Sequence, residues 1–217
     1  MPINQNLQTI KNTLPEGVTL VAVSKTKPTE DILEAYTTGH RIFGENKIQE
    51  MTQKWETMPK DIKWHMIGHV QRNKIKYMAE YVSLIHGVDS LKLLKEIDKQ
   101  AKKHQRTIDC LLQVHIAEED TKFGMNAFEL NELVSSDELA LMQNIKITGL
   151  MGMATLTEDK EQIRREFEHL KSLFDKTKIH LPIITVLSMG MSGDYEIAIE
   201  QGSTMVRIGS SIFGSRD

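Results

Sequence analysis

The sequence predicts a single (β/α)8 barrel of the TIM type, with an extra helix before the first strand. Short runs rich in apolar and β-branched residues alternate with longer amphipathic stretches along the whole chain. This alternation is typical of βαβ units and a parallel sheet. There are eight such runs, and 217 residues lie near the lower size limit of an eight-unit barrel. A doubly wound open sheet is the alternative fold that the same alternation allows.

Each predicted strand is a short apolar run bounded by polar residues or glycine. A helix precedes the first strand, because four apolar residues recur there at helical spacing: Ile3, Leu7, Ile10 and Leu14. We expect strands at residues 19–23, 41–43, 63–67, 82–87, 107–115, 146–151, 183–187 and 204–208. Each strand but the last is expected to be followed by a substantial helix.

Two of the helical stretches are especially clear. Residues 158–176 carry apolar side chains spaced four, three and four residues apart: Ile163, Phe167, Leu170 and Phe174. Residues 90–104 open with Ser90, a residue type that commonly caps the N-terminus of a helix. No change of composition marks a boundary, so we expect residues 1–217 to form one domain.

Composition and charge exclude several classes of protein. The chain is 40% hydrophobic and 26% charged, which is ordinary for a globular protein. Its net charge of −3 and the absence of a basic block argue against nucleic-acid binding. No apolar stretch approaches the roughly 20 residues of a membrane span, and no secretory signal is visible, so we expect a cytoplasmic protein. Cys110, the single cysteine, lies in an apolar run and is expected to be a buried, inert thiol.

Glycine and serine gather in the loops after the last two predicted strands. Barrels of this type commonly bind phosphate with the loops after strands 7 and 8. Glycine lets backbone N–H groups approach an anion, and serine adds hydroxyl donors. The residues in question are Gly190, Ser192, Gly193, Gly209, Ser210 and Ser211. The pattern indicates a phosphate site, although ordinary tight turns use the same residue types.

Lys25 follows the first predicted strand, where a barrel places its active site. A lysine held at a barrel mouth can form a Schiff base, whereas a surface lysine such as Lys27 needs no function. A lysine beside a phosphate site suits either pyridoxal 5′-phosphate (PLP) or an aldolase acting on a sugar phosphate. His65 and His69 have the spacing of a helical zinc pair, but a strand and Gly68 interrupt any helix there, so we expect no metal site.

Longer motifs occur in order along nearly the whole chain, at residues 21–28, 43–46, 64–74, 188–194 and 202–209. Together they resemble the YggS-type pyridoxal-phosphate homeostasis proteins. The resemblance implies a barrel like the N-terminal domain of alanine racemase, with PLP held as a Schiff base on Lys25. It also implies that Asn46 lies near the cofactor and that Arg207 faces the pyridine nitrogen. The implied phosphate contacts are Ser192, Gly209 and Ser210.

The resemblance and the residues together predict a protein of PLP (vitamin B6) and amino-acid homeostasis without catalytic residues. An arginine at the pyridine nitrogen would hold that nitrogen unprotonated and weaken the ring as an electron sink. The alternative is a PLP-dependent amino-acid racemase, but racemases of this barrel type take their second base from a further domain. We expect a monomer that binds PLP, has PLP-dependent apoenzymes as candidate partners, and binds neither nucleic acid nor membrane.

Overall fold

The eight strands close into a barrel in the order β1 to β8, with every neighbouring pair parallel. The computed structural model describes residues 2–119 and 123–214. The first strand pairs with the last through Thr19 to Met205 and Ala22 to Ile208, which excludes the open sheet. The predicted fold class is therefore confirmed. Residue 1, residues 120–122 and residues 215–217 of the expected domain lie outside the described part.

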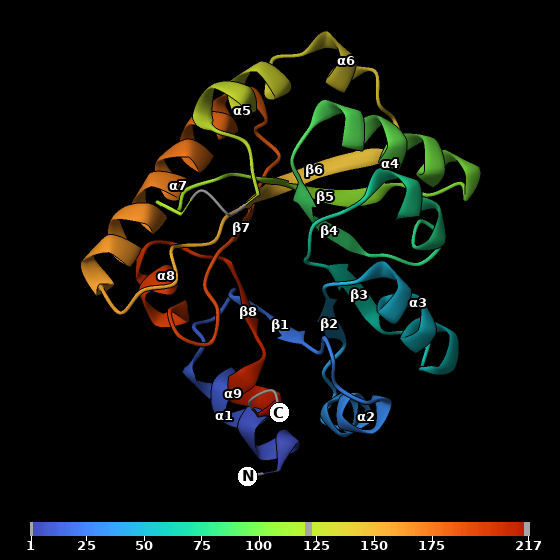
Figure 1. Ribbon diagram of the computed structural model, residues 1–217, viewed down its shortest axis with the longest axis vertical. Coiled ribbons are helices and arrows are strands. Elements are labelled where there is room, and N and C mark those ends of the chain that lie inside the picture. The colour runs from blue at the N-terminus through green and yellow to red at the C-terminus, as the bar shows by residue number, and fades with distance from the viewer. Residues whose placement is uncertain (1, 120–122, 215–217) are drawn as a thin grey trace.

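The predicted strands are all present, with bounds that differ by a few residues. They are β1 (Thr19–Val23), β2 (Ile42–Glu45), β3 (Lys63–Met66), β4 (Leu84–Val88), β5 (Ile108–Gln113), β6 (Ile145–Met151), β7 (Val186–Ser188) and β8 (Met205–Ile208). Figure 1 shows them between α7 and α8 on one side and α3 and α4 on the other.

The helices of the described residues follow the predicted alternation with one clear exception. They are α1 (Ile3–Thr13), α2 (Thr29–Thr37), α3 (Ile48–Thr57), α4 (Leu91–Lys103), α5 (Ala127–Val134), α6 (Asp137–Ala140), α7 (Lys160–His180), α8 (Tyr195–Glu200) and α9 (Ser210–Phe213). Ser90 caps α4 as predicted, since its hydroxyl accepts the Leu93 N–H at 3.3 Å.

The expectation of a substantial helix after every strand but the last is wrong for β3. A six-residue 3-10 helix, η1 (Arg72–Tyr77), takes that place, and α8 after β7 is also just six residues long. In η1, Ile75 is buried while Arg72 and Lys76 are exposed. One buried residue in six provides too narrow an apolar face to hold a full α-helix against the barrel.

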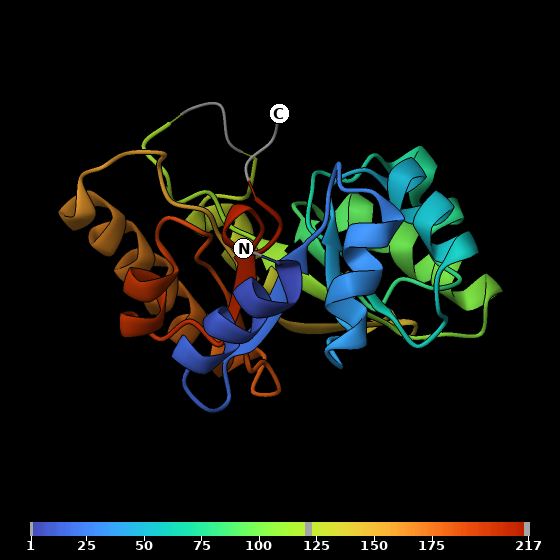
Figure 2. The same cartoon turned by 90° about the horizontal axis from the view of Figure 1, so that it is seen from below.

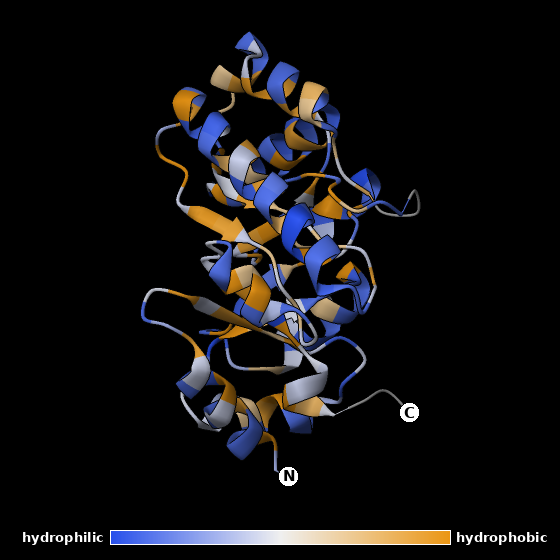
Figure 3. Cartoon of the chain, turned by 90° about the vertical axis from the view of Figure 1, so that its left-hand side faces the viewer, coloured by the Kyte–Doolittle hydropathy of each residue, from blue (hydrophilic) through white to orange (hydrophobic). Residues whose placement is uncertain are grey.

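Two apolar layers hold the barrel together. The smaller one fills the barrel interior with five buried side chains: Val21, Leu84, Leu111, Met151 and Met205. The larger one lies between the strands and the helices and includes Trp64 and Phe167. Figure 3 shows the strands mostly in hydrophobic colours and much of the helical surface in hydrophilic ones. Cys110 is buried as predicted, and burial raises the pKa of its thiol well above the ordinary value.

The two ends of the described chain meet at α1 and α9. Figure 2 shows the N-terminal helix beside the last helix. The Asn6 side chain donates to the backbone oxygen of Ile212 at 3.0 Å. This contact holds α9 at the end of the barrel where Ser210 begins the helix. Among the helices of the described residues, none combines the length and apolarity needed to cross a membrane.

Candidate functional site

A cavity of about 380 Å³ opens at the C-terminal ends of the strands. The structure brings all six predicted site residues to its wall: Lys25, Asn46, Ser192, Arg207, Gly209 and Ser210. They come from β8 and from the segments that follow β1, β2, β7 and β8. Residues up to 185 positions apart in sequence, 25 and 210, therefore share one cavity.

Sequence reasoning missed much of the remaining wall. Ile67 and Leu156 are apolar lining residues, and Lys27, interpreted as an ordinary surface lysine, also lines the cavity. Met153 is a further apolar lining residue. Leu156 is 90% exposed, and a large apolar residue within the polar loop after β6 is a signal that could have identified this wall.

Lys25 lies in a tight turn directly after β1. Ser24 is buried, Lys25 is half-buried, and the Lys27 N–H closes the turn by donating to the Ser24 backbone oxygen at 3.1 Å. Thr26 has a φ of 66°, a left-handed conformation that is uncommon for a residue other than glycine. The Thr26 N–H donates to Glu50 Oε1 at 2.6 Å. The turn therefore has a defined conformation that brings Lys25 to the cavity wall.

The loops after β7 and β8 meet at Gly209. Its N–H donates to Ser192 Oγ at 3.2 Å, which joins the two loops. Gly190 has a φ of 94°, and a Cβ there would lie 2.6 Å from the Ala198 Cβ, so this turn requires glycine. At Gly193 a Cβ would meet nothing within 4 Å, so the structure gives no steric reason for glycine at that position.

The first residues of α9 present backbone donors next to this junction. Within the described residues, no hydrogen bond is formed by the backbone N–H groups of Ser210 and Ser211. Unpaired N–H groups beside a serine hydroxyl are typical of a site that accepts an anion. This part of the wall can therefore hold a phosphate group.

Arg207 is a buried cation at the floor of the cavity. Its side chain is held by Ser188 and Gly152: Nη1 donates to the Ser188 backbone oxygen at 3.0 Å and to Ser188 Oγ at 2.6 Å, and Nη2 donates to the Gly152 oxygen at 3.1 Å. No carboxylate among the described residues forms an ion pair with it. Burial lowers the pKa of Arg207 to about 10, and Asp194 partly opposes this shift, so the guanidinium stays charged at neutral pH.

Two buried histidines continue from Arg207 into the barrel. His86 Nδ1 lies 3.2 Å from Ser188 Oγ, and His86 Nε2 lies 3.1 Å from His65 Nδ1. Arg207 donates to the Ser188 hydroxyl, and the same hydroxyl and the two histidine rings form a continuous chain of hydrogen-bond contacts, whose directions depend on the tautomers of the two rings. Burial lowers the pKa of His65 to about 3 and that of His86 well below its usual value, so both rings are neutral.

The histidines considered for a zinc pair are not brought together. His65 contacts His86, whereas His69 is exposed, stacks on Phe123 and lies 3.5 Å from Asp89. In the described ranges, no group of three or more histidine, cysteine, aspartate or glutamate side chains is arranged to hold a metal ion.

Because His65 and His86 are buried as neutral rings, we expect the folded protein to lose stability in acid. Their pKa values are lower in the folded state than in the unfolded chain, so unfolding takes up protons below about pH 6.5. The contribution of His65 is complete above that pH and is lost as the pH falls toward about 3. Each such histidine should lower the free energy of unfolding by about 1.4 kcal/mol per pH unit in this range.

Urea unfolding between neutral pH and about pH 5 measures this slope. We expect His65→Asn to make the slope shallower by about one proton, because it removes one of the buried rings that take up a proton on unfolding. An unchanged slope in His65→Asn would contradict the prediction.

Comparison with known proteins identifies the family. Residues 2–217 match the alanine racemase N-terminal domain family. The chain is 41% identical over 211 residues to the pyridoxal phosphate homeostasis protein of Vibrio alginolyticus, covering 94% of this chain and 88% of that protein. The protein of the same name from Aquifex aeolicus is 41% identical over 200 residues, covering 91% and 86%. The chain belongs to the pyridoxal phosphate homeostasis protein family. The family predicted from the sequence motifs is thus confirmed.

Solved structures of the family share this fold. PipY of Synechococcus elongatus PCC7942, at 33% identity, has been solved without PLP and with PLP bound. The TM-scores are 0.92 and 0.88, and each comparison covers 98% of this chain and 100% of PipY. An alanine racemase of Clostridium difficile has a TM-score of 0.82 at 16% identity, covering 99% of this chain and 57% of the racemase. At that identity the likeness shows the fold alone.

Proposed function

We propose that this chain binds PLP in the cavity at the barrel mouth, attached covalently through Lys25, and serves PLP and amino-acid homeostasis in the cytoplasm. The observation that carries the proposal is the meeting of Lys25, Arg207 and the junction at Gly209 around one cavity. Structures of the relative PipY with and without PLP support it, since that protein shares the fold at 33% identity. We further propose that residues 1–217 act as one domain and as a monomer.

The residues around the cavity fit PLP in size and chemistry. A volume of about 380 Å³ is within the range of small-molecule sites. Lys25 would bond the aldehyde carbon, Arg207 would donate to the pyridine nitrogen, and Ser192, Gly209 and Ser210 would hold the phosphate, with Asn46 near the ring. When bound, PLP supplies an aldehyde for attachment and a ring that can take up negative charge.

We propose that the protein does not turn over amino acids. The charged Arg207 favours an unprotonated pyridine nitrogen, which reduces the ability of the ring to stabilise a carbanion. Racemisation also needs a proton donor and an acceptor on opposite faces of the substrate. The ionisable side chains among the described lining residues are Lys25, Lys27 and Arg207. A carrier or regulator that passes PLP to apoenzymes, without nucleic-acid or membrane partners, fits these groups better than a racemase does.

Borohydride reduction of the PLP-loaded protein, followed by peptide mass spectrometry, tests the attachment site. The label is expected on the peptide that contains Lys25. Lys27→Ala is the matched control, because Lys27 lines the same cavity and its loss should leave the label in place. A label on another lysine would overturn the assignment.

Incubation of the loaded protein with a panel of L-amino acids tests the absence of turnover. Chiral chromatography should show no more D-amino acid than an equal concentration of PLP alone produces. Racemisation at ordinary enzyme rates, on the order of 1–10³ s⁻¹, would show that the protein is a racemase.

A further inference from the structure

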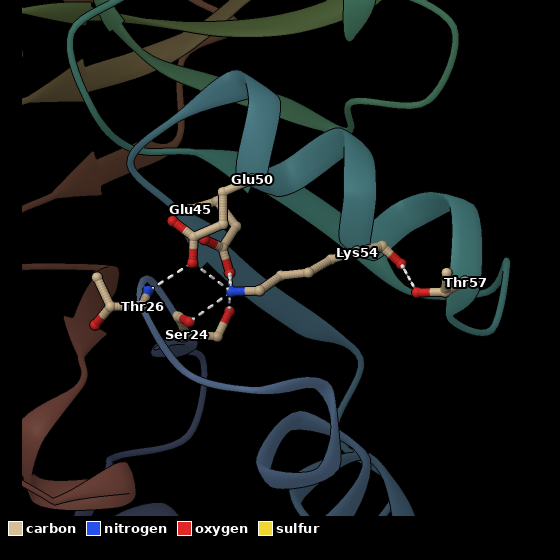
Figure 4. A network of polar contacts seen from close by, with 6 residues as sticks. All are labelled: Ser24, Thr26, Glu45, Glu50, Lys54 and Thr57. Atoms are coloured by element: carbon tan, nitrogen blue, oxygen red, sulfur yellow. Dashed lines mark hydrogen bonds and ion pairs between the residues drawn. The ribbon is translucent and has the colours of Figure 1, made fainter.

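A buried cluster of charged side chains lies behind the turn that carries Lys25 (Figure 4). Lys54 Nζ donates to Glu45 Oε1 at 2.8 Å, to Glu50 Oε1 at 2.7 Å and to the Ser24 backbone oxygen at 2.9 Å. The side chains of Lys54 and Glu45 are 8% and 0% exposed. An ammonium group has three protons, and these three acceptors engage all of them. Contacts with three different segments of the chain therefore fix the position of the Lys54 side chain.

The cluster binds the residue on each side of Lys25. Ser24 contributes twice: its hydroxyl donates to Glu45 Oε1 at 2.5 Å and its backbone oxygen accepts from Lys54. On the other side, the Thr26 N–H donates to Glu50 Oε1. Figure 4 shows these contacts converging from the end of β1, the end of β2 and the first turns of α3. The backbone before and after Lys25 is thus joined to one ion cluster.

The conformation of Thr26 needs such support. A β-branched residue at a φ of 66° is strained, and strain of this kind persists where surrounding contacts hold it. Thr26 is itself exposed, so apolar packing does not hold it in place. The hydrogen bond from the Thr26 N–H to Glu50 supports this conformation instead. Lys54 in turn holds the Glu50 carboxylate in place.

A contribution to the stability of the fold does not by itself account for the buried ion cluster of Lys54, Glu45 and Glu50. Burial raises the pKa of Glu45, an effect that Lys54 opposes, and Glu45 Oε2 has no hydrogen-bond partner among the described residues. Removing such charges from water is costly, and an apolar cluster of similar volume often stabilises a fold equally well. A role in fixing the geometry of the adjacent turn accounts for the cluster better.

We propose that Lys54 is a positioning residue for Lys25, acting through Glu45 and Glu50 on the backbone of Ser24 and Thr26. The inference rests on the proposed attachment of PLP to Lys25. In that attachment the neutral amine nitrogen of Lys25 bonds to the aldehyde carbon, and the aldehyde oxygen leaves as water with both protons of the amine. The cluster directs the amine toward the aldehyde but does not contribute to holding the phosphate.

Two measurements on the same variants separate positioning from general damage. The first is the rate at which the visible absorption of attached PLP develops. The second is the affinity for pyridoxine 5′-phosphate, which has the ring and the phosphate but an alcohol in place of the aldehyde. Misplacing a reacting group by about 1 Å can slow a reaction up to about a hundredfold. We therefore expect Glu50→Ala and Lys54→Met to slow attachment on the order of tenfold or more, with affinity for pyridoxine 5′-phosphate changed by no more than about twofold.

Two further variants serve as controls. Asp175→Ala removes the acid of another ion pair with i,i+4 spacing, Lys171–Asp175 on the exposed side of α7, and should leave both measurements unchanged. Glu50→Gln keeps an oxygen acceptor for the Thr26 N–H and should restore most of the attachment rate. Glu50 is less buried than Lys54, so Glu50→Ala provides the test if Lys54→Met does not fold.

An unchanged attachment rate in folded Glu50→Ala would overturn the inference. So would an equal loss of attachment and of pyridoxine 5′-phosphate affinity, because that pattern indicates a collapsed cavity. If the unmodified protein attached no PLP at all, the proposed function would fail instead, and the two failures are therefore distinguishable.

Discussion

Lys25→Ala is expected to abolish covalent attachment of PLP while leaving weak, reversible binding. The substitution removes the amine but leaves Arg207 and the junction of the two loops at Gly209 intact. Hydrogen bonds to a charged group contribute about 1.5–3 kcal/mol each, so several of them can hold a phosphate dianion without a covalent bond. The visible absorption of attached PLP should disappear, and equilibrium dialysis should still detect bound PLP.

Lys27→Ala is the matched control for this prediction. It removes a second cationic side chain from the same cavity wall and should keep the visible absorption. Borohydride-stable PLP remaining on Lys25→Ala would show that another lysine is the attachment site. Complete loss of binding at any PLP concentration would show that the loops do not hold the phosphate.

The barrel could be predicted because its signal is local and repeated. Each strand is a short apolar run, and the ends of β1 and β8 are marked by the change from apolar residues to Lys25 and Gly209. The expectation of a substantial helix after β3 was wrong because it rested on the general alternation of strands and helices and not on an apolar face in that segment. In the structure a single buried residue, Ile75, is all that η1 contributes to the core.

The candidate site was predictable in part for a similar reason. The loops that carry Lys25 and Ser192 follow strands, and parallel strands bring their ends to one edge. Arg207 lies inside β8, and its direction toward the cavity depends on contacts with Ser188 and Gly152 that no local pattern reveals. Its expected role came from the resemblance to the family.

The ion cluster behind Lys25 was missed altogether. Glu50 and Lys54 are four residues apart on α3, a spacing that usually indicates a solvated helical pair. What distinguishes this pair is the buried Glu45 at the end of β2 and the Ser24 carbonyl at the end of β1. The contacts of Lys54 with Glu45 and Ser24 form only when α3 packs against the ends of β1 and β2, so the sequence alone gives little sign of the cluster.

Gly209→Asp is expected to prevent PLP binding while leaving Lys25 reactive. Gly209 has a φ of −121°, which is not the left-handed conformation that favours glycine, and a Cβ there would lie 3.2 Å from the Val23 Cβ and backbone oxygen. The new carboxylate would stand at the wall expected to hold the phosphate. Two like charges about 4 Å apart repel by about 4 kcal/mol at an effective dielectric constant of about 20. Because about 1.4 kcal/mol corresponds to tenfold, PLP affinity should fall on the order of a hundredfold or more.

Equilibrium dialysis of PLP and of pyridoxal, which lacks the phosphate, separates charge from crowding in this variant. Gly209→Asn has nearly the same size as Gly209→Asp but no charge, so it should weaken PLP binding far less. For pyridoxal the two variants should behave alike, because there is no anion for the carboxylate to repel. Equal PLP affinity in the two variants would mean that the phosphate lies elsewhere. Equal affinity of the unmodified protein for PLP and pyridoxal would mean that the junction at Gly209 does not recognise phosphate.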